Sequence, residues 1–253
     1  MRHGQRFGLV LSAILLAALA GAACNSDKGK GGGSGAAPKP TADKPAPTGS
    51  GVIQGTVKFA GSVPEPEAWG GTSSSDCRSL HPGTIQLVKV QDGKLEDAFV
   101  YVKAGLPEGY HPTPEKAIVV DQKGCEFTPR IFGLVAGQPI EFGNSDAFMH
   151  NVKSPEFNQG LATKGVKMQL KLQEEGVMVP IRCDVHPWMR AHAGVLSHPY
   201  FDVSKADGAF KIAGLVDGEY TVVAWHEKLG TVEQKVKVAG AAPAALDFEM
   251  RSK

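Results

Sequence analysis

The chain has 253 residues and a formal net charge of +1, because 27 lysines and arginines nearly balance 26 aspartates and glutamates. This balance, with no Lys/Arg-rich run beyond residue 50, argues against nucleic acid as a partner. Hydrophobic residues make up 42% of the chain. The part after residue 50, roughly 200 residues, is long enough for one large domain or two small ones.

The N-terminus predicts export. Two arginines and a histidine precede an apolar run over residues 7–20, which is short for a membrane span and ends in small residues. Residues 21–24, Gly-Ala-Ala-Cys, resemble a lipobox, with glycine where that family usually has an aliphatic residue. The resemblance implies a lipoprotein signal peptide over residues 1–23 and lipidation of Cys24, which would anchor the protein on the periplasmic or cell-surface side of a bacterial membrane.

Residues 24–50 predict a flexible tether. After the cysteine they are mainly Gly, Ser, Ala, Pro, Lys, Asp and Thr, with no large apolar side chain. Such a segment cannot bury enough surface to offset the entropy lost on ordering. We expect it to hold a folded head away from a lipid surface.

Alternating apolar and polar residues dominate the remaining chain, a pattern typical of half-buried β-strands. Turn signals such as Asp92-Gly93 and Asp207-Gly208 separate the strands, and no helical period longer than about ten residues stands out. The sequence therefore predicts an all-β, antiparallel, sandwich-like fold. Strands are predicted at residues 53–59, 98–102, 118–120, 166–172, 177–183, 220–224 and 236–238.

Four residues form a candidate metal-ligand set. Cys183, His186 and Met189 place a thiolate, an imidazole and a thioether within seven residues, and His150 follows an apolar strand and an Asn-Ser-Asp turn. Two His, one Cys and a weak axial Met are the ligands of electron-transfer copper sites, since they suit both Cu(I) and Cu(II). Zinc is the rival, but Met is not a normal zinc ligand, and no second Cys or carboxylate is spaced to complete a tetrahedron. One type 1 copper is the prediction.

Residues 115–199 resemble a small cupredoxin. The resemblance rests on the Gly-Gln-Pro-Ile-Glu-Phe motif at residues 137–142, the His150-Asn151 pair and the Cys-x-x-His-x-x-Met loop, whose spacing with a proline after the His is most similar to that of amicyanin. It implies a Greek-key β-sandwich that transfers electrons through one type 1 (blue) copper. The ligands it implies are His150, Cys183, His186 and Met189.

The resemblance and the chemistry together assign roles around this site. Asn151 would tie the two ligand-bearing segments together. Pro187 would stiffen the loop, because it fixes φ and lacks an N–H group. Trp188 and Phe148 would exclude water, and an exposed edge of His186 would be the natural exit for an electron.

The remaining cysteines suggest a disulfide. If Cys24 carries the lipid and Cys183 binds the metal, Cys77 and Cys125 are left. Export favours a disulfide between them, and two buried free thiols are the alternative.

The flanking residues 51–114 and 200–253 resemble the carboxypeptidase regulatory-like, or carbohydrate-binding-like, β-sandwich in their Gly-rich strand patterns. This resemblance implies a discontinuous, prealbumin-like sandwich, with the cupredoxin inserted in it or next to it. Insertion at a loop tip is where such events are tolerated. The whole arrangement looks like the plastocyanin- or methylamine-utilisation-like proteins of bacterial envelopes.

The favoured function is a lipid-anchored electron carrier, not an enzyme, that exchanges electrons with a redox protein such as a c-type cytochrome or an oxidoreductase. Four lysines would suit an acidic partner, although a solvated strand face explains them equally. They are Lys153, Lys164, Lys167 and Lys171.

Two alternatives make different demands on the structure. A carbohydrate- or protein-binding envelope module, with a structural cupredoxin, needs an exposed aromatic platform; the candidates are Tyr101, Tyr110, Tyr220 and Trp225. A copper enzyme needs a second, three-His site. Its candidates are His192, His198 and His226.

Overall fold

The computed structural model describes residues 44–70, 75–80 and 83–252. All of these described residues belong to one compact unit. The predicted signal peptide, Cys24 and most of the predicted tether lie outside the described residues. No helix in the described part of the chain has the length and apolar character needed to cross a membrane.

The all-β fold class predicted by the alternating pattern is confirmed. The predicted antiparallel pairing holds only in part, because residues 118–122 pair with residues 140–144, and residues 131–135 with residues 192–196, in parallel. Among the described residues the helical content is the four-residue α1 (Ser75–Arg78), and β-strands form the rest of the regular structure. Four larger sheets make two sandwiches, and a small hairpin-like pair joins β2 (Glu67–Ala68) to β3 (Thr84–Ile85).

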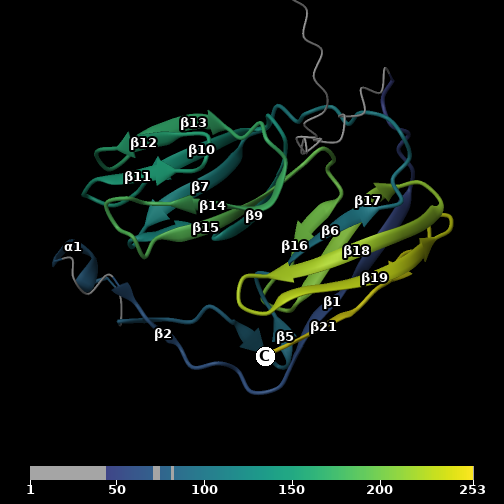
Figure 1. Ribbon diagram of the computed structural model, residues 1–253, viewed down its shortest axis with the longest axis horizontal. Coiled ribbons are helices and arrows are strands. Elements are labelled where there is room, and N and C mark those ends of the chain that lie inside the picture. Colours follow the sequence, from purple (N-terminus) through teal and green to yellow (C-terminus); the bar gives the residue numbers. More distant parts are fainter. Residues whose placement is uncertain (1–43, 71–74, 81–82, 253) are drawn as a thin grey trace, which may run out of the picture. The chain divides into compact units, whose positions relative to one another are not determined.

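The first sandwich is built from strands in the first and last parts of the described chain, coloured purple to teal and green to yellow in Figure 1. One sheet contains β1 (Gly51–Ala60), β4 (Val90–Gln91), β5 (Lys94–Leu95), β17 (Ala209–Leu215), β20 (Ala244–Ala245) and β21 (Phe248–Arg251). The other contains β6 (Phe99–Ala104), β16 (Phe201–Val203), β18 (Gly218–His226) and β19 (Gly230–Val238). Strand β1 pairs with β17 on one edge and with β20 and β21 on the other, so the two ends of the chain share a sheet.

The second sandwich uses the strands between β6 and β16. One sheet has the order β13 (Lys167–Lys171), β10 (Pro139–Asn144), β7 (Ile118–Lys123), β8 (Glu126–Thr128). The other has the order β12 (Asn158–Leu161), β11 (His150–Lys153), β14 (Gly176–Arg182), β15 (Arg190–Leu196), β9 (Ile131–Val135). Their facing side chains form one core, which includes Val120, Phe142, Val152 and Ile181.

Alternation is followed closely on β13 but breaks on β14. On β13 the lysines and glutamine are exposed while Met168 and Leu170 are half-buried, as predicted. On β14 the pairing with β15 shifts between Gly176 and Val179, and Met178 has a positive φ of 64°. The predicted inward position of Val177 is therefore wrong. The Val177 side chain is 43% exposed. The neighbouring Met178 is buried instead, on the opposite face of the sheet.

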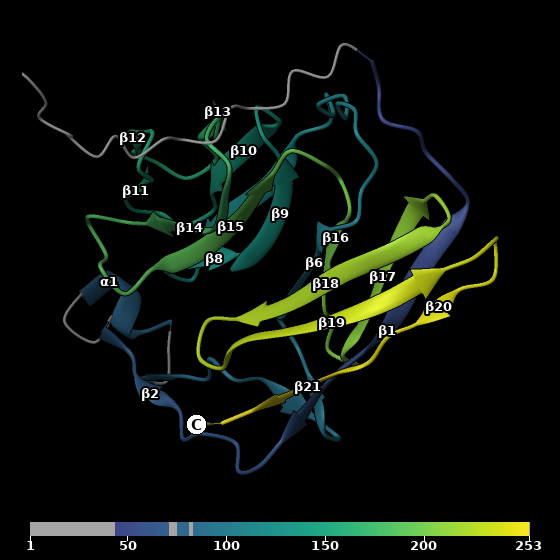
Figure 2. The same ribbon diagram turned by 45° about the vertical axis from the view of Figure 1, so that its right-hand side comes forward.

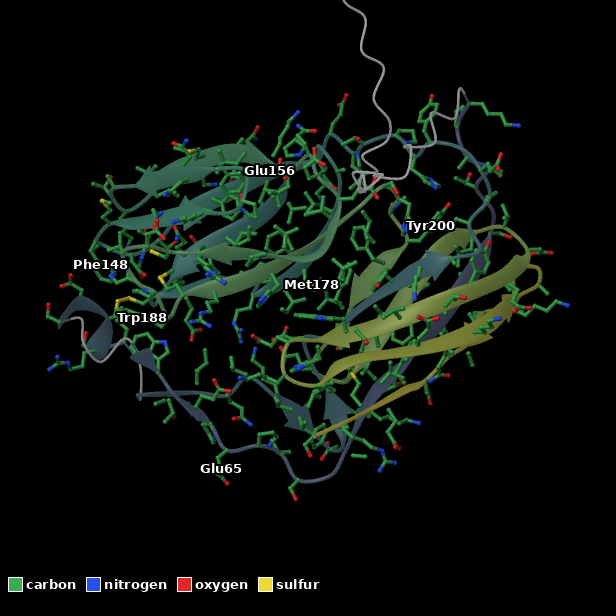
Figure 3. The ribbon with its side chains drawn as sticks, viewed as in Figure 1. Glu65, Phe148, Glu156, Met178, Trp188 and Tyr200 are labelled. Atoms are coloured by element: carbon green, nitrogen blue, oxygen red, sulfur yellow. A yellow bond between two sulfur atoms is a disulfide. The ribbon has the colours of Figure 1, made fainter. Side chains whose placement is uncertain are left out.

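A small apolar cluster joins the two sandwiches. Phe99 from the first sandwich packs with Ile131, Met178 and Leu196 from the second, and Figures 2 and 3 show Met178 and the strands β9 and β15 beside β16 and β6. The predicted domain boundaries at residues 114/115 and 199/200 fall in the connections between β6 and β7 and between β15 and β16. They stay a prediction.

Candidate metal centre

The candidate ligands lie at one end of the second sandwich. His150 is the first residue of β11, Cys183 directly follows β14, and Met189 directly precedes β15. The loop between Cys183 and Met189 closes on itself, because the Met189 N–H donates to the His186 carbonyl at 2.9 Å and the Cys183 N–H donates to the Met189 carbonyl at 3.3 Å. Two neighbouring strands of one sheet thus hold the ends of a short, tightly turned loop beside His150.

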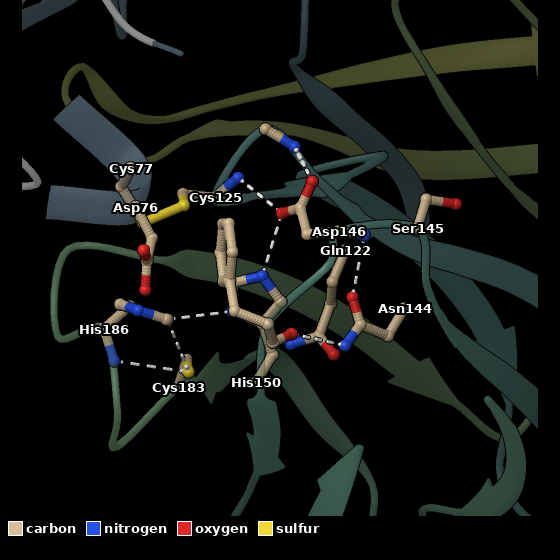
Figure 4. A network of polar contacts seen from close by, with 12 residues as sticks. Asp76, Cys77, Gln122, Cys125, Asn144, Ser145, Asp146, His150, Cys183 and His186 are labelled. Atoms are coloured by element: carbon tan, nitrogen blue, oxygen red, sulfur yellow. Dashed lines mark hydrogen bonds and ion pairs between the residues drawn. A yellow bond between two sulfur atoms is a disulfide. The ribbon is translucent and has the colours of Figure 1, made fainter. Parts of the chain in front are cut away.

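Three donor atoms of different residues converge (Figure 4). Nδ1 of His150 lies 2.8 Å from Nδ1 of His186, and Sγ of Cys183 lies 3.9 Å from the latter atom. These ligand atoms lie within 4.8 Å of one another, and all three residues are buried. Met189 is 1% exposed and belongs to the same core cluster as Cys183. Two imidazole nitrogens, a thiol sulfur and a nearby thioether are donors that suit copper in both oxidation states.

A buried carboxylate orients His150. Oδ2 of Asp146 lies 2.8 Å from Nε2 of His150, and the two carboxylate oxygens accept the N–H groups of Gly124 at 2.8 Å and Cys125 at 2.9 Å. Burial by itself raises the pKa of Asp146, but these N–H groups and His150 outweigh burial and lower it. An ionised carboxylate only accepts, so Nε2 of His150 donates to Asp146, and Nδ1 is the ring nitrogen that faces His186.

Backbone N–H groups surround the Cys183 sulfur. The N–H of Asn151 lies 3.4 Å from Sγ and the N–H of His186 lies 3.3 Å from it. The Asn151 side chain also bridges the two ligand-bearing segments, since its Oδ1 accepts the Asp184 N–H at 2.5 Å and its amide donates to Asn158 at 2.6 Å.

The metal centre is covered on the side of His186. That residue is 6% exposed, so the expected exposed histidine edge is absent. The rings of Phe148 and Trp188 pack against His186 with centroids 5.9 and 5.1 Å away, and Asp76 of α1 lies beside it in Figure 4. Burial, followed by the charge of His150, lowers the pKa of His186. The carboxylates of Asp76 and Asp146 act in the opposite direction. Pro187, by contrast, is exposed.

A disulfide joins this cover to the site. Cys77 of α1 is bonded to Cys125, with Cα atoms 5.8 Å apart and 48 positions between them in the sequence. A second group of converging metal-ligand atoms includes one of these cysteines; it consists of Cys125, Asp146 and His150. Because the Cys125 sulfur is tied up in the disulfide, it cannot act as a thiolate ligand. The free cysteine among the described residues is Cys183.

The second copper site expected for a copper enzyme is not formed. Within the described ranges, neither group of converging metal-ligand atoms includes His192, His198 or His226. His192 packs against Trp225, and His198 packs against His111 and Tyr200. The aromatic platform of the binding-module alternative is not formed either. Tyr220 is buried, Tyr101 and Trp225 are half-buried, and Tyr110, 48% exposed, stands apart as the exposed member.

Sequence reasoning missed three residues at the site. Asp146 had a local signal, a carboxylate four positions before a candidate histidine ligand. Asp76 and Trp69 had none, because they lie more than 70 positions before the site. Trp69 is 2% exposed and contacts Trp188 edge-on at 5.4 Å. The predicted disulfide partner Cys77 is the one feature that could have placed this segment near the loop.

No family model and no curated protein matches the chain. Among solved structures, a purple cupredoxin from Nitrosopumilus maritimus is 20% identical with a TM-score of 0.28, covering 31% of this chain and 98% of that one. A Cu(I) form of an amicyanin variant is 22% identical with a TM-score of 0.29, covering 38% of this chain and 97% of that one. A copper-containing nitrite reductase, NirK, from Thermus scotoductus SA-01 is 19% identical with a TM-score of 0.28, covering 38% of this chain but 26% of the reductase. These likenesses concern the fold of part of the chain.

Proposed function

We propose that this protein is an electron carrier of the bacterial envelope, with one type 1 copper held by His150, Cys183, His186 and Met189. The observation that carries the proposal is the convergence of two imidazole nitrogens and the free thiol sulfur in a buried pocket. Bound copper would supply a one-electron couple, Cu(II)/Cu(I), with little change in geometry.

The residues of the chain would do the remaining work. Asp146 holds the Nε2 proton of His150, so that Nδ1 is free to bind. The N–H groups of Asn151 and His186 point at the Cys183 sulfur and would hold it in place for the metal. Phe148 packs against His150 and Trp188 against His186. These rings would limit the access of water to a bound metal. The site supports electron storage and exchange, and we propose that the protein is not an enzyme.

Spectroscopy of the purified full-length chain loaded with Cu(II) tests the proposal. We expect one copper per chain, an intense visible thiolate-to-copper charge-transfer band and the narrow copper hyperfine splitting of a type 1 site in EPR. Cys183→Ser should abolish the band, and Met189→Leu should shift it. Met168→Leu, on β13, is the matched control and should leave it unchanged. A colourless copper complex, two coppers per chain, or preferential loading with zinc would contradict the proposal.

We also propose that the protein is exported and anchored by a lipid on Cys24. The support is the sequence alone: an apolar run ending in Gly-Ala-Ala-Cys, followed by a polar segment. Mass spectrometry of the mature N-terminus should find a diacylglycerol-modified cysteine, and Cys24→Ser should move the protein from the membrane fraction to the soluble fraction. An unmodified mature chain in the soluble fraction would contradict the anchor.

A further inference from the structure

The closed cover over His186 directs attention to the ends of the metal-binding loop. The candidate ligands are between 0 and 6% exposed, so they offer a partner little surface. The loop is flanked by two exposed arginines. Arg182 directly precedes Cys183, and Arg190 directly follows Met189.

These arginines face each other, and neither makes an ion pair within the described residues. Arg182 and Arg190 are directly opposite in the antiparallel pairing of β14 and β15, and like charges in that position destabilise a sheet. Nε of Arg190 donates to the Pro187 carbonyl at 3.5 Å. In the described part of the chain, no carboxylate oxygen lies within 4.0 Å of either guanidinium group, so neither arginine forms an ion pair. Arg130 and Lys153, by contrast, do form ion pairs. Repulsion between the two guanidinium groups is therefore not balanced by an ion pair within the described residues.

The positive potential extends along the same face of the sheet. Burial is the largest cause that lowers the pKa of His192. The charges of Arg130, Arg182 and Arg190 lower this pKa further, and the charge of Glu227 raises it. Three guanidinium groups thus lie close to one imidazole. Of the three, Arg130 is neutralised by Glu227 at 2.5 Å.

The lysines that the sequence offered for an acidic partner are placed less favourably. Lys153 pairs with Asp184 at 3.0 Å, and Lys167 pairs with Glu141 at 2.8 Å. Lys164 and Lys171 are exposed and make no ion pair within the described residues, but neither adjoins a ligand in sequence. The unneutralised charge nearest to the ligands along the chain is that of the arginine pair.

A cavity of about 520 Å³ lies beside Arg190. Its wall includes Trp188 from the metal-binding loop, Phe127 from β8 and the turn between β18 and β19. Charges in that turn are paired, Glu227 with Arg130 and Lys228 with Glu67. The cavity therefore offers a recess of aromatic and charged groups, which also include Glu126, with Arg190 in its wall.

We propose that Arg182 and Arg190 are the docking site for an acidic redox protein, whose surface carboxylates pair with the two guanidinium groups; of the two arginines, Arg190 lines this cavity and Arg182 lies opposite it in the sheet. The inference rests on the proposed function. Arginine suits the role because its planar fork binds a carboxylate through two parallel hydrogen bonds. A carboxylate held there is one residue from Cys183 or Met189. In the complex one electron passes between the partner's cofactor and the copper, one being oxidised and the other reduced, and no atom is transferred.

Electron exchange with small charged complexes tests the docking site. The copper(II) protein is reduced with ferrocyanide, an anionic donor, in a stopped-flow instrument at low ionic strength. We expect the second-order rate constant to fall about tenfold in Arg182→Gln/Arg190→Gln, with the difference shrinking as salt is added. Lys164→Gln/Lys171→Gln removes the same charge elsewhere and should stay close to wild type. Equal losses in both double variants, or none in the arginine variant, would overturn the docking site.

A measurement without copper separates this inference from the proposed function. Hexaglutamate is titrated into the metal-free chain, and the arginine Nε–H signals are followed by NMR. Shifts should concentrate at Arg182 and Arg190 and vanish in the arginine double variant. A chain that shows these shifts but binds no copper would overturn the proposed function and support the docking site. A chain with the type 1 spectrum whose shifts spread over its lysines would overturn the docking site alone.

Discussion

The carboxylate of Asp146 accepts a hydrogen bond from Nε2–H of His150 at 2.8 Å and thereby decides which ring nitrogen faces Cys183. The carboxylate is itself held by the N–H groups of Gly124 and Cys125, so its position does not depend on the histidine. Since Cys125 is bonded to Cys77, the orientation of His150 is connected through backbone and disulfide to α1. One end of the site is therefore preorganised by residues that do not contact the three converging donor atoms.

Asp146→Asn should weaken copper binding. The asparagine keeps the size of the side chain, but its neutral amide oxygen is a weaker acceptor for Nε2–H of His150. Its NH₂ group cannot accept a hydrogen bond from the N–H groups of Gly124 or Cys125. Loss of such a partner typically lowers metal affinity about 10- to 100-fold. Competition with a Cu(I) chelator measures the affinity. Asp247→Asn is the matched control, because Asp247 also accepts a backbone N–H and pairs with a lysine, but it lies in the other sandwich. Equal affinities of wild type and Asp146→Asn would contradict the positioning role.

Removing the disulfide should destabilise the fold. Cross-linking Cys77 to Cys125 closes a loop of 48 positions in the unfolded chain, and a loop of that size corresponds to about 4 kcal/mol in the loop-entropy model. Cys77→Ser/Cys125→Ser should therefore lower the free energy of unfolding of the metal-free chain by about that amount. Urea unfolding without reductant measures it. With reductant, wild type and double variant should unfold at the same urea concentration; a difference that persists would assign the loss to the serines.

The sequence predicted the fold class, and it placed three candidate ligands in one loop, because both depend on local patterns. Alternation over residues 166–172 reports directly on a strand with one buried face. Cys183, His186 and Met189 are close in the chain, so their spacing alone places them in one loop. His150 could be nominated because it follows a strand of the same type.

The parts that the sequence could not predict depend on contacts between distant segments. The burial of His186 results from Trp188 and from a segment more than 100 positions earlier. The bulge at Met178 reverses the facing of one residue, since side chains alternate strictly and a single extra residue shifts the register. The arginine pair is visible in three dimensions because Arg182 and Arg190 oppose each other only after β14 and β15 have paired.

Gly194→Ala should loosen the contact between the sandwiches. A Cβ at Gly194 would lie 2.2 Å from Cζ of Phe99, whose ring is fully buried. Overpacking of this kind costs about 1–3 kcal/mol, and urea unfolding should show it. The added change Phe99→Leu should recover part of the loss. Gly160→Ala on β12 is the matched control, because its Cβ would meet nothing within 4 Å, and it should change the stability by less than about 0.5 kcal/mol. A loss in Gly160→Ala as large as in Gly194→Ala would show that the cost is not specific to the contact.

His198 should make the protein less stable in mild acid. Its Nδ1 accepts the Tyr200 N–H at 3.2 Å, and burial, followed by the charge of His111, lowers its pKa to about 4. The unfolded residue binds a proton near pH 6.5, so the unfolded state holds more protons as the pH falls from there to about 4, and the free energy of unfolding decreases through that window. The decrease amounts to roughly 3 kcal/mol when complete. In urea unfolding of the metal-free chain from pH 7 down to pH 4, His198→Gln should remove that part of the slope; parallel curves for variant and wild type would show that His198 is not the group responsible.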